Sequence, residues 1–323
     1  MSNVGSAGGC LLAGILIASP GFAEDYDFEI DVAFDSSQFD GSATTSTPGG
    51  TIFSSATTDS DSLSVLGSWY FTGLSDDKGP RARAVLVDRA SSLSIGYSRT
   101  ELSNSIAFSS SDPAFPGLPV ELSFDSKVDA FAADFRYVDR DSGWFGSVGL
   151  FTANADSAVT SGQPSDVDGW SLGVGKYLAD TTTLSLNFSD VYTGQDSSAI
   201  GLSFEHLGDL GASWQYAVDL EYSYADVGGG FDLNTWGAAI SLYPTRDFEF
   251  GLAVEDVSGN FPGADSQTVE GFASWYVKPN VRLSARYRVD DADYFGSASF
   301  VGGSPTVSDS DEDSFGISAS IRF

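Results

Sequence analysis

The sequence is poor in the residues that most redox, metal and catalytic sites require. Among 323 residues it has one cysteine, Cys10, one histidine, His206, and one methionine. A lone cysteine cannot form an intramolecular disulfide, and a lone histidine cannot supply the several nitrogen ligands of a typical zinc site. A glycine-rich phosphate loop is absent too. We therefore expect no cofactor, no metal site and no enzymatic activity.

Basic residues are scarce. Lys and Arg number 15 against 45 Asp and Glu, which gives a formal net charge of -30. Because an acidic surface repels phosphate, a nucleic-acid partner is not expected. The excess of carboxylates either favours small cations as partners or simply keeps the protein surface well solvated.

Long apolar runs are missing as well. A helix that spans a bilayer takes about 20 apolar residues, and the longest run, CLLAGILIA at residues 10–18, is much shorter. Small residues precede Glu24, so the run resembles a secretory signal peptide cleaved after Ala23, although residues 1–9 carry no Lys or Arg. The sequence therefore predicts a signal peptide at residues 1–23, which removes Cys10, and one domain at residues 24–323.

Alternation of apolar and polar residues is what the domain has in abundance. In the last ten residues, Ser314–Phe323, every second residue is apolar, which is the pattern of a strand with one apolar face. Similar segments recur to give about fourteen strands, within a range of roughly twelve to sixteen. Short turns are expected near 139–143, 179–182, 207–211, 244–247 and 278–280. Longer polar connections are expected between them, among them 36–60, 103–119 and 290–313, and a turn at 72–92 with a short helix around Arg83–Arg89. The fold class is all-β, a transmembrane antiparallel up-and-down β-barrel.

Aromatic residues gather where the predicted strands end. They fit an aromatic girdle at the membrane interface, although aromatics are common in any strand. The set is Tyr26, Tyr70, Tyr137, Trp144, Tyr177, Trp214, Tyr243, Phe248, Tyr276 and Phe323.

The predicted signal peptide, the alternating strands and the terminal Ser-Ile-Arg-Phe resemble the outer-membrane β-barrel porins of Gram-negative bacteria. The resemblance implies an outer-membrane location, lipids as neighbours and passive diffusion of solutes through a water-filled lumen. It also implies that Phe323, at the end of the last strand, is the signal read by the barrel assembly machinery. The predicted strand count is lower than that of the sixteen-stranded general porins, and their constriction loop has no clear match.

If the apolar set faces lipid, the alternate set faces the lumen. On the first strand that set is acidic, with Asp27, Glu29 and Asp31. On the next-to-last strand it is basic, with Arg282, Arg286 and Arg288. The last strand lies between them with mostly small residues and Arg322. The two rows either pair across the wall and stiffen it or create a transverse field across the lumen. Mixed charge recurs at the further candidates for lining the lumen, Asp134, Arg136, Asp219 and Glu221.

The remaining polar features favour plain solvation. Acidic residues at 59–61, 290–293 and 309–313 are expected in solvated loops, with loose binding of divalent cations as the alternative. His206 is interpreted as an interface residue, since Ser203 and Glu205 point to the opposite face of its strand.

These observations predict a porin for small hydrophilic solutes or ions with a mild preference for cations. The alternative is a structural or adhesive outer-membrane barrel without an open channel. An uptake channel for apolar molecules would need a plug before the first strand, and the predicted first strand begins almost at the cleavage site. A soluble sandwich is a further alternative.

Overall fold

The computed structural model describes residues 25–47, 50–75, 79–110, 120–157, 165–192, 196–211, 213–260, 265–294, 304–305 and 308–323. The expected signal peptide lies outside these residues. Within them, no helix is both long and apolar enough to cross a membrane.

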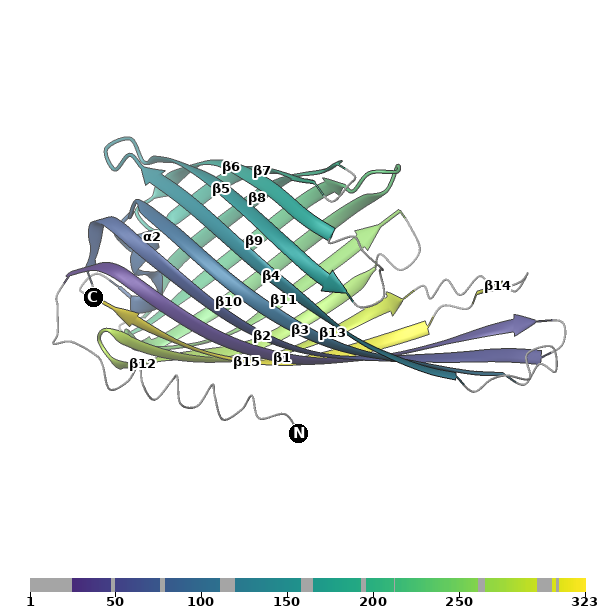
Figure 1. The fold of residues 1–323 in the computed structure, drawn as a ribbon. Helices are drawn as coiled ribbons and strands as arrows, with labels where there is room; N and C mark the ends of the chain where they lie inside the picture. Colours follow the sequence, from purple (N-terminus) through teal and green to yellow (C-terminus); the bar gives the residue numbers. More distant parts are fainter. Residues whose placement is uncertain are drawn as a thin grey trace.

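Fourteen long antiparallel strands form one closed barrel (Figure 1). Each strand pairs with its neighbours in chain order, and β1 pairs with both β2 and β15, which closes the ring. This confirms the predicted fold class and the strand number. The fifteenth strand, β14 (Ser304–Pro305), is a two-residue addition to β1 outside the ring. The ring strands are β1 (Asp25–Thr47), β2 (Gly50–Ser75), β3 (Ser92–Ser110), β4 (Val120–Val138), β5 (Trp144–Ser157), β6 (Ser165–Ala179), β7 (Thr182–Tyr192), β8 (Asp196–Leu210), β9 (Trp214–Asp226), β10 (Asp232–Thr245), β11 (Phe248–Gly259), β12 (Ser266–Lys278), β13 (Val281–Tyr294) and β15 (Ser308–Arg322).

The connections differ between the two ends of the barrel. Short turns link β4 to β5, β6 to β7, β10 to β11 and β12 to β13, as expected, and β1 starts and β15 ends on the same side. The turn expected at 207–211 falls later, because β8 continues to Leu210. The alternation of apolar and polar residues predicts the position of a strand better than the residue at which it ends. Polar turns and the ends of strands contain the same residue types.

The polar connection expected at 36–60 is strand over most of its length, and strands also extend into the described parts of the connections expected at 103–119 and 290–313. Residues 36–60 belong mostly to β1 and β2, which continue as a paired hairpin to Thr47 and Gly50. A transmembrane strand needs about 9–11 residues, so β1, with 23, and β2, with 26, project past the barrel at the end opposite the start of β1 and the end of β15 (Figure 1).

The expectation that the acidic groups lie in loops is wrong for the same reason. Residues 59–61 lie in β2, 290–293 in β13 and 309–313 in β15. A Ser-, Thr- and Asp-rich sequence indicates that a segment contacts water, but it does not distinguish a loop from a strand. A strand outside the membrane can be solvated on both faces. Among the described residues, no group of three or more His, Cys, Asp or Glu could hold a metal ion.

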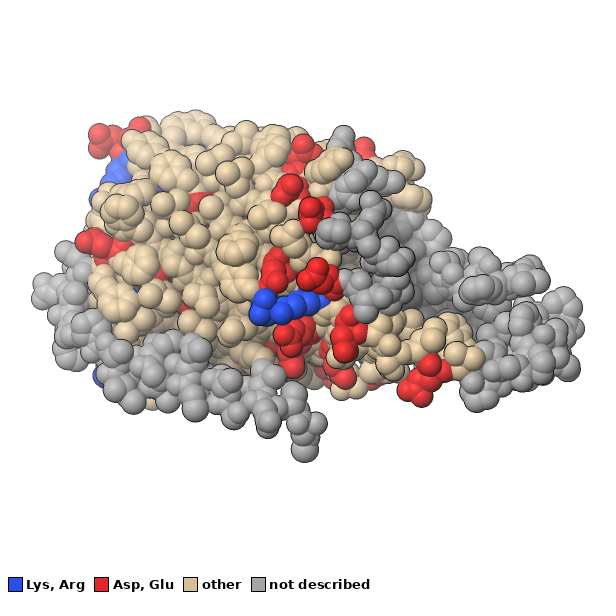
Figure 2. Space-filling view, viewed as in Figure 1, with Lys and Arg blue, Asp and Glu red and all other residues tan. Residues whose placement is uncertain are grey.

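The outer surface of the barrel is apolar. Large side chains on the outward positions are exposed, among them Leu150 at 62%, Trp236 at 60% and Ile95 at 59%. Figure 2 shows a broad band almost free of charge, bordered by Asp and Glu toward the end with the long connections. An apolar band of this kind is what lipid tails require of a closed barrel.

The girdle prediction is half wrong. Tyr137, Trp144, Trp214, Phe248 and Phe323 are 38–59% exposed on the outside, but the other five aromatics are at most 7% exposed: Tyr26, Tyr70, Tyr177, Tyr243 and Tyr276. Four of these tyrosines pack in two buried clusters with residues of the connection between β2 and β3. The core of this barrel therefore lies inside it, at the end with the short turns.

That connection folds inward as two helical turns, η1 (Arg81–Arg83) and α2 (Ala84–Val87). We call residues 79–91 the crossing segment. The short helix expected around Arg83–Arg89 is present, but the segment is more than a turn. Leu86 packs with Val138 of β4 and Ala217 of β9, and Ala84 packs with Tyr26 of β1.

Candidate functional site

Three arginines on β13 and β15 pair with three carboxylates on β1. Arg322 Nε donates to Glu29 Oε2 at 2.9 Å, Arg282 Nη2 to Asp31 Oδ1 at 2.8 Å, and Arg286 Nη2 to Asp35 Oδ1 at 2.6 Å. The acidic and basic rows are therefore joined, which favours their structural interpretation over a transverse field.

Small residues on β15 make two of these pairs possible. Gly316 is opposite both Arg286 and Asp35, and Ser320 is opposite both Arg282 and Asp31, so each pair reaches over the strand between. A Cβ atom on Gly316 would fall on the Asp35 carboxylate and the Arg286 side chain. The third pair is closed off, because Arg322 and Glu29 are only 3% and 4% exposed.

The crossing segment follows β2 and contacts the wall on the opposite side of the barrel. In the ring of fourteen, β9 is seven strands from β2 in either direction. Arg83 nonetheless donates from Nη1 to Glu205 Oε1 of β8 at 2.7 Å and from Nη2 to Asp219 Oδ2 of β9 at 2.6 Å. Its Nε donates to the Tyr243 hydroxyl of β10 at 2.8 Å. The segment thus lies across the barrel interior.

The surroundings of Arg83 keep its guanidinium group protonated. Burial opposes the charge, but Tyr243 and Asp219 outweigh burial and keep the pKa of the guanidinium above its ordinary value. Charge-assisted hydrogen bonds to two carboxylates are stronger than neutral ones.

Further contacts hold the two ends of the segment. Arg81 forms an ion pair with Asp247 in the β10–β11 turn, and its carbonyl accepts a hydrogen bond from Arg322 Nη1 at 3.1 Å. Arg89 Nη2 donates to Asp180 Oδ1 in the β6–β7 turn at 2.9 Å, and Arg140 Nη2 donates to the Asp88 carbonyl at 2.8 Å.

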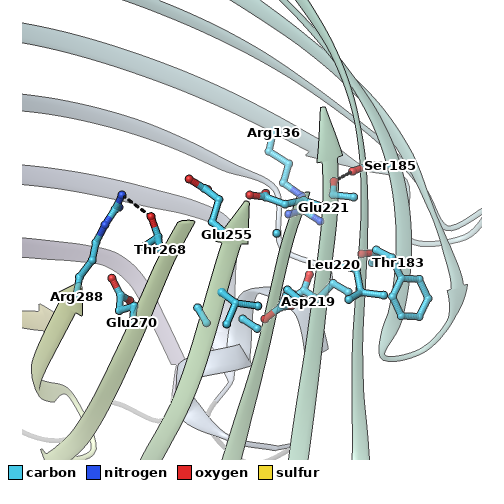
Figure 3. A pocket seen from close by; sticks show the side chains of 18 of the residues that line it. Arg136, Thr183, Ser185, Asp219, Leu220, Glu221, Glu255, Thr268, Glu270 and Arg288 are labelled. Carbon is cyan, nitrogen blue, oxygen red and sulfur yellow. Dashed lines mark hydrogen bonds between the residues drawn. The ribbon is translucent and has the colours of Figure 1, made fainter. Parts of the chain in front are cut away.

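A cavity of about 480 Å³ lies inside the barrel beside this segment (Figure 3). Its walls come from strands on both sides of the ring, so it is part of the barrel interior. Its charged lining residues are Arg136, Glu205, Asp219, Glu221, Glu255, Glu270 and Arg288. Hydroxyl groups of Thr183, Ser185, Ser203 and Thr268 add hydrogen-bonding capacity.

The charges in the cavity are not balanced. Glu205 and Asp219 are occupied by Arg83, and Arg288 pairs with Asp290 at 2.7 Å. Arg136 lies over the Phe145 ring at 4.5 Å. Glu221, Glu255 and Glu270 form no salt bridge with any residue in the described part of the chain. Glu255 and Glu270 still act electrostatically on Arg288, so the cavity presents three carboxylates that no arginine of the described residues contacts directly.

The residues expected to line the lumen fall into three groups. Arg136, Asp219, Glu221 and Arg288 line the cavity, whereas Glu29, Asp31, Arg282, Arg286 and Arg322 take part in the ion pairs that join β1 to β13 and β15. Asp27 is exposed where the β1–β2 register shifts, and Asp134 is exposed on β4. Phe323 is 41% exposed, and its backbone nitrogen donates to the Phe28 carbonyl at 2.8 Å.

His206 is accounted for by its neighbours. Its Nδ1 shares a hydrogen bond with the Thr182 hydroxyl at 2.8 Å, and its Nε2 shares one with the Tyr216 hydroxyl at 3.3 Å.

Sequence reasoning missed part of the cavity. Glu205, Glu255 and Glu270 lie on strands whose alternation, followed residue by residue, assigns them to the inner face. Arg83 carried no such signal, because it lies on a connection and its partners come from three strands far away in the sequence.

A search of solved structures finds barrels of the same kind along nearly the whole chain. The outer membrane protein Omp33 of Acinetobacter baumannii aligns with a TM-score of 0.54 at 13% identity, covering 94% of this chain and 100% of that one. A TodX deletion mutant, described as a monoaromatic hydrocarbon channel, aligns with a TM-score of 0.56 at 12% identity, covering 95% and 94%. This is the fold of outer-membrane β-barrel proteins.

The likeness is one of fold. No protein-family model matches the sequence, and a search of curated proteins finds no match either. At 12–13% identity, what those barrels conduct does not transfer to this one.

Proposed function

We propose that the protein is an outer-membrane channel of a Gram-negative bacterium through which small hydrophilic solutes diffuse passively. The observation that carries the proposal is the contrast between the two faces of the barrel. The outer face is a band of exposed apolar side chains, whereas the inner face bears charged and hydroxyl groups around a cavity of about 480 Å³. A closed wall between lipid and a polar interior is the arrangement of water-filled outer-membrane channels.

We further propose a mild preference for cations. Among the described residues, three cavity carboxylates, those of Glu221, Glu255 and Glu270, have no ion-pair contact. They outnumber Arg136, a cavity arginine that has no ion-pair contact in this part of the chain either. Rings of acidic side chains favour cations in pores because they lower the energy of positive charge along the path.

The crossing segment sets the width of this path. It occupies the interior at the end with the short turns, so solutes must pass beside it or wait for it to move. We therefore expect a small conductance from the native protein.

Planar-bilayer recordings of the purified protein test the function. We expect discrete conductance steps and, in a KCl gradient, a reversal potential of the sign that marks K⁺ as the more permeant ion. The triple variant Glu221→Gln/Glu255→Gln/Glu270→Gln should lose most of that preference. Asp141→Asn, in an exposed turn outside the cavity, is the matched control and should retain it.

Two outcomes contradict the proposal. A preference for Cl⁻ would refute the cation selectivity. A folded barrel that remains electrically silent, with and without the crossing segment anchored by Arg83, would favour a structural or adhesive barrel instead.

A further inference from the structure

The far wall of the barrel contains a site already shaped for a guanidinium group. Three neighbouring strands contribute one acceptor each: Glu205 on β8, Asp219 on β9 and Tyr243 on β10. All three guanidinium nitrogens of Arg83 donate to them, and both oxygens of Asp219 accept, at 3.2 Å and 2.6 Å. This forked geometry suits a planar guanidinium and fits an ammonium group poorly.

The acceptors belong to the wall and not to the crossing segment. Glu205 and Asp219 line the cavity, and with Arg83 in place their side chains are still 28% and 34% exposed. The Tyr243 hydroxyl also donates to Glu249 Oε1 at 2.7 Å, so its orientation is fixed by the wall itself. A solute in the cavity therefore meets the same carboxylates that Arg83 occupies.

We propose that Glu205, Asp219 and Tyr243 form a binding site for solutes that bear a guanidinium group, and that Arg83 occupies it as an internal competitor. A solute that takes the site displaces Arg83 and releases the crossing segment from the far wall. The inference rests on the proposed channel function, because the solute reaches the site through the lumen.

Competition within the chain sets the scale of the effect. A tethered group acts at an effective concentration on the order of mM. A free guanidinium compound must therefore be present at a comparable concentration to displace Arg83 from the native protein. Without the Arg83 side chain, the same compound should bind at lower concentration.

The test uses methylguanidinium chloride as probe and methylammonium chloride as the matched control. In Arg83→Ala we expect a larger single-channel conductance than in the native protein. We also expect methylguanidinium to reduce the Arg83→Ala current at concentrations in the mM range or below. Methylammonium should reduce it only at concentrations at least tenfold higher.

In the native protein, the same block should require about tenfold more methylguanidinium than in Arg83→Ala. Adding Glu205→Gln and Asp219→Asn to Arg83→Ala should abolish the block.

Binding measured by calorimetry in detergent makes the result independent of conduction. Heat-modifiable migration on a gel checks that each variant is folded, and Arg83→Gln replaces Arg83→Ala if the latter does not fold. The inference is overturned if folded Arg83→Ala binds no methylguanidinium, or if binding is unchanged after the two carboxylates are removed. If the variant conducts but does not bind the probe, the channel function stands and this site fails. If it binds the probe and no form conducts, the site stands and the channel function fails.

Discussion

Two carboxylates on β1 both pair with an arginine but differ in burial, so the free energy of unfolding that each pair contributes can be predicted separately. Glu29 and Asp35 lie on the same strand, and each accepts a hydrogen bond from an arginine, Glu29 from Arg322 on the neighbouring β15 and Asp35 from Arg286 on β13, across β15. The Glu29–Arg322 pair is 4% and 3% exposed, whereas the Asp35–Arg286 pair is 27% and 53% exposed. Glu29→Gln and Asp35→Asn each remove one charge and keep the shape of the side chain.

Burial decides the expected cost. Removing one partner of a buried ion pair destabilises a protein by about 3–5 kcal/mol, because the other charge is left without compensation. In Glu29→Gln, Arg322 would keep the Arg81 carbonyl and the Tyr276 ring, whose centroid lies 5.2 Å away. We therefore expect a loss near the lower end, about 3 kcal/mol. The exposed pair should lose less than about 1 kcal/mol in Asp35→Asn.

Denaturant unfolding of the two variants in lipid vesicles or detergent measures both free energies under one condition. A double variant, Glu29→Gln/Arg322→Met, should recover part of the loss, because it leaves no unpaired charge from this pair. Equal losses in the two single variants, or a larger loss in Asp35→Asn, would refute the argument that burial determines the strength of these pairs.

Two further predictions concern β15. Gly316→Leu should displace the Arg286–Asp35 pair and cost about 1–3 kcal/mol through overpacking, whereas Ser318→Leu, opposite Ala33 and Ser284, should cost less; denaturant unfolding measures both, and equal costs would contradict the role of Gly316. Deleting Phe323 should lower the amount of protein inserted into the outer membrane while leaving the conductance of the inserted fraction unchanged; immunoblots of membrane fractions check this, and normal levels would count against an assembly signal at the C-terminus.

The alternation of residues along the chain was enough to predict the barrel. Each strand that alternates as Ser314–Phe323 does has one apolar and one polar face. Closing the sheet into a ring pairs every strand edge and lets the apolar face contact lipid. The small residues of β15 also predicted room between the acidic and basic rows. These are local properties of period two, so the sequence carries them directly.

Composition gave wrong predictions where one residue type is common in two different structural settings. The Ser-, Thr- and Asp-rich stretch 36–60 indicated a loop, yet it continues the strands beyond the barrel. The tyrosines at strand ends indicated a girdle, yet Tyr26 and Tyr243 turn inward. A tyrosine suits a lipid interface and a buried contact equally well, because it combines an apolar ring with a hydroxyl group.

The alternation along the strands determined that this chain makes a membrane-type barrel with a charged inner face. The tertiary structure alone decided what fills that face. Arg83 meets Glu205, Asp219 and Tyr243 across residue separations of 122 to 160. Such contacts depend on the closure of the ring, which brings the connection between β2 and β3 opposite β9, and no pattern local to the sequence records them.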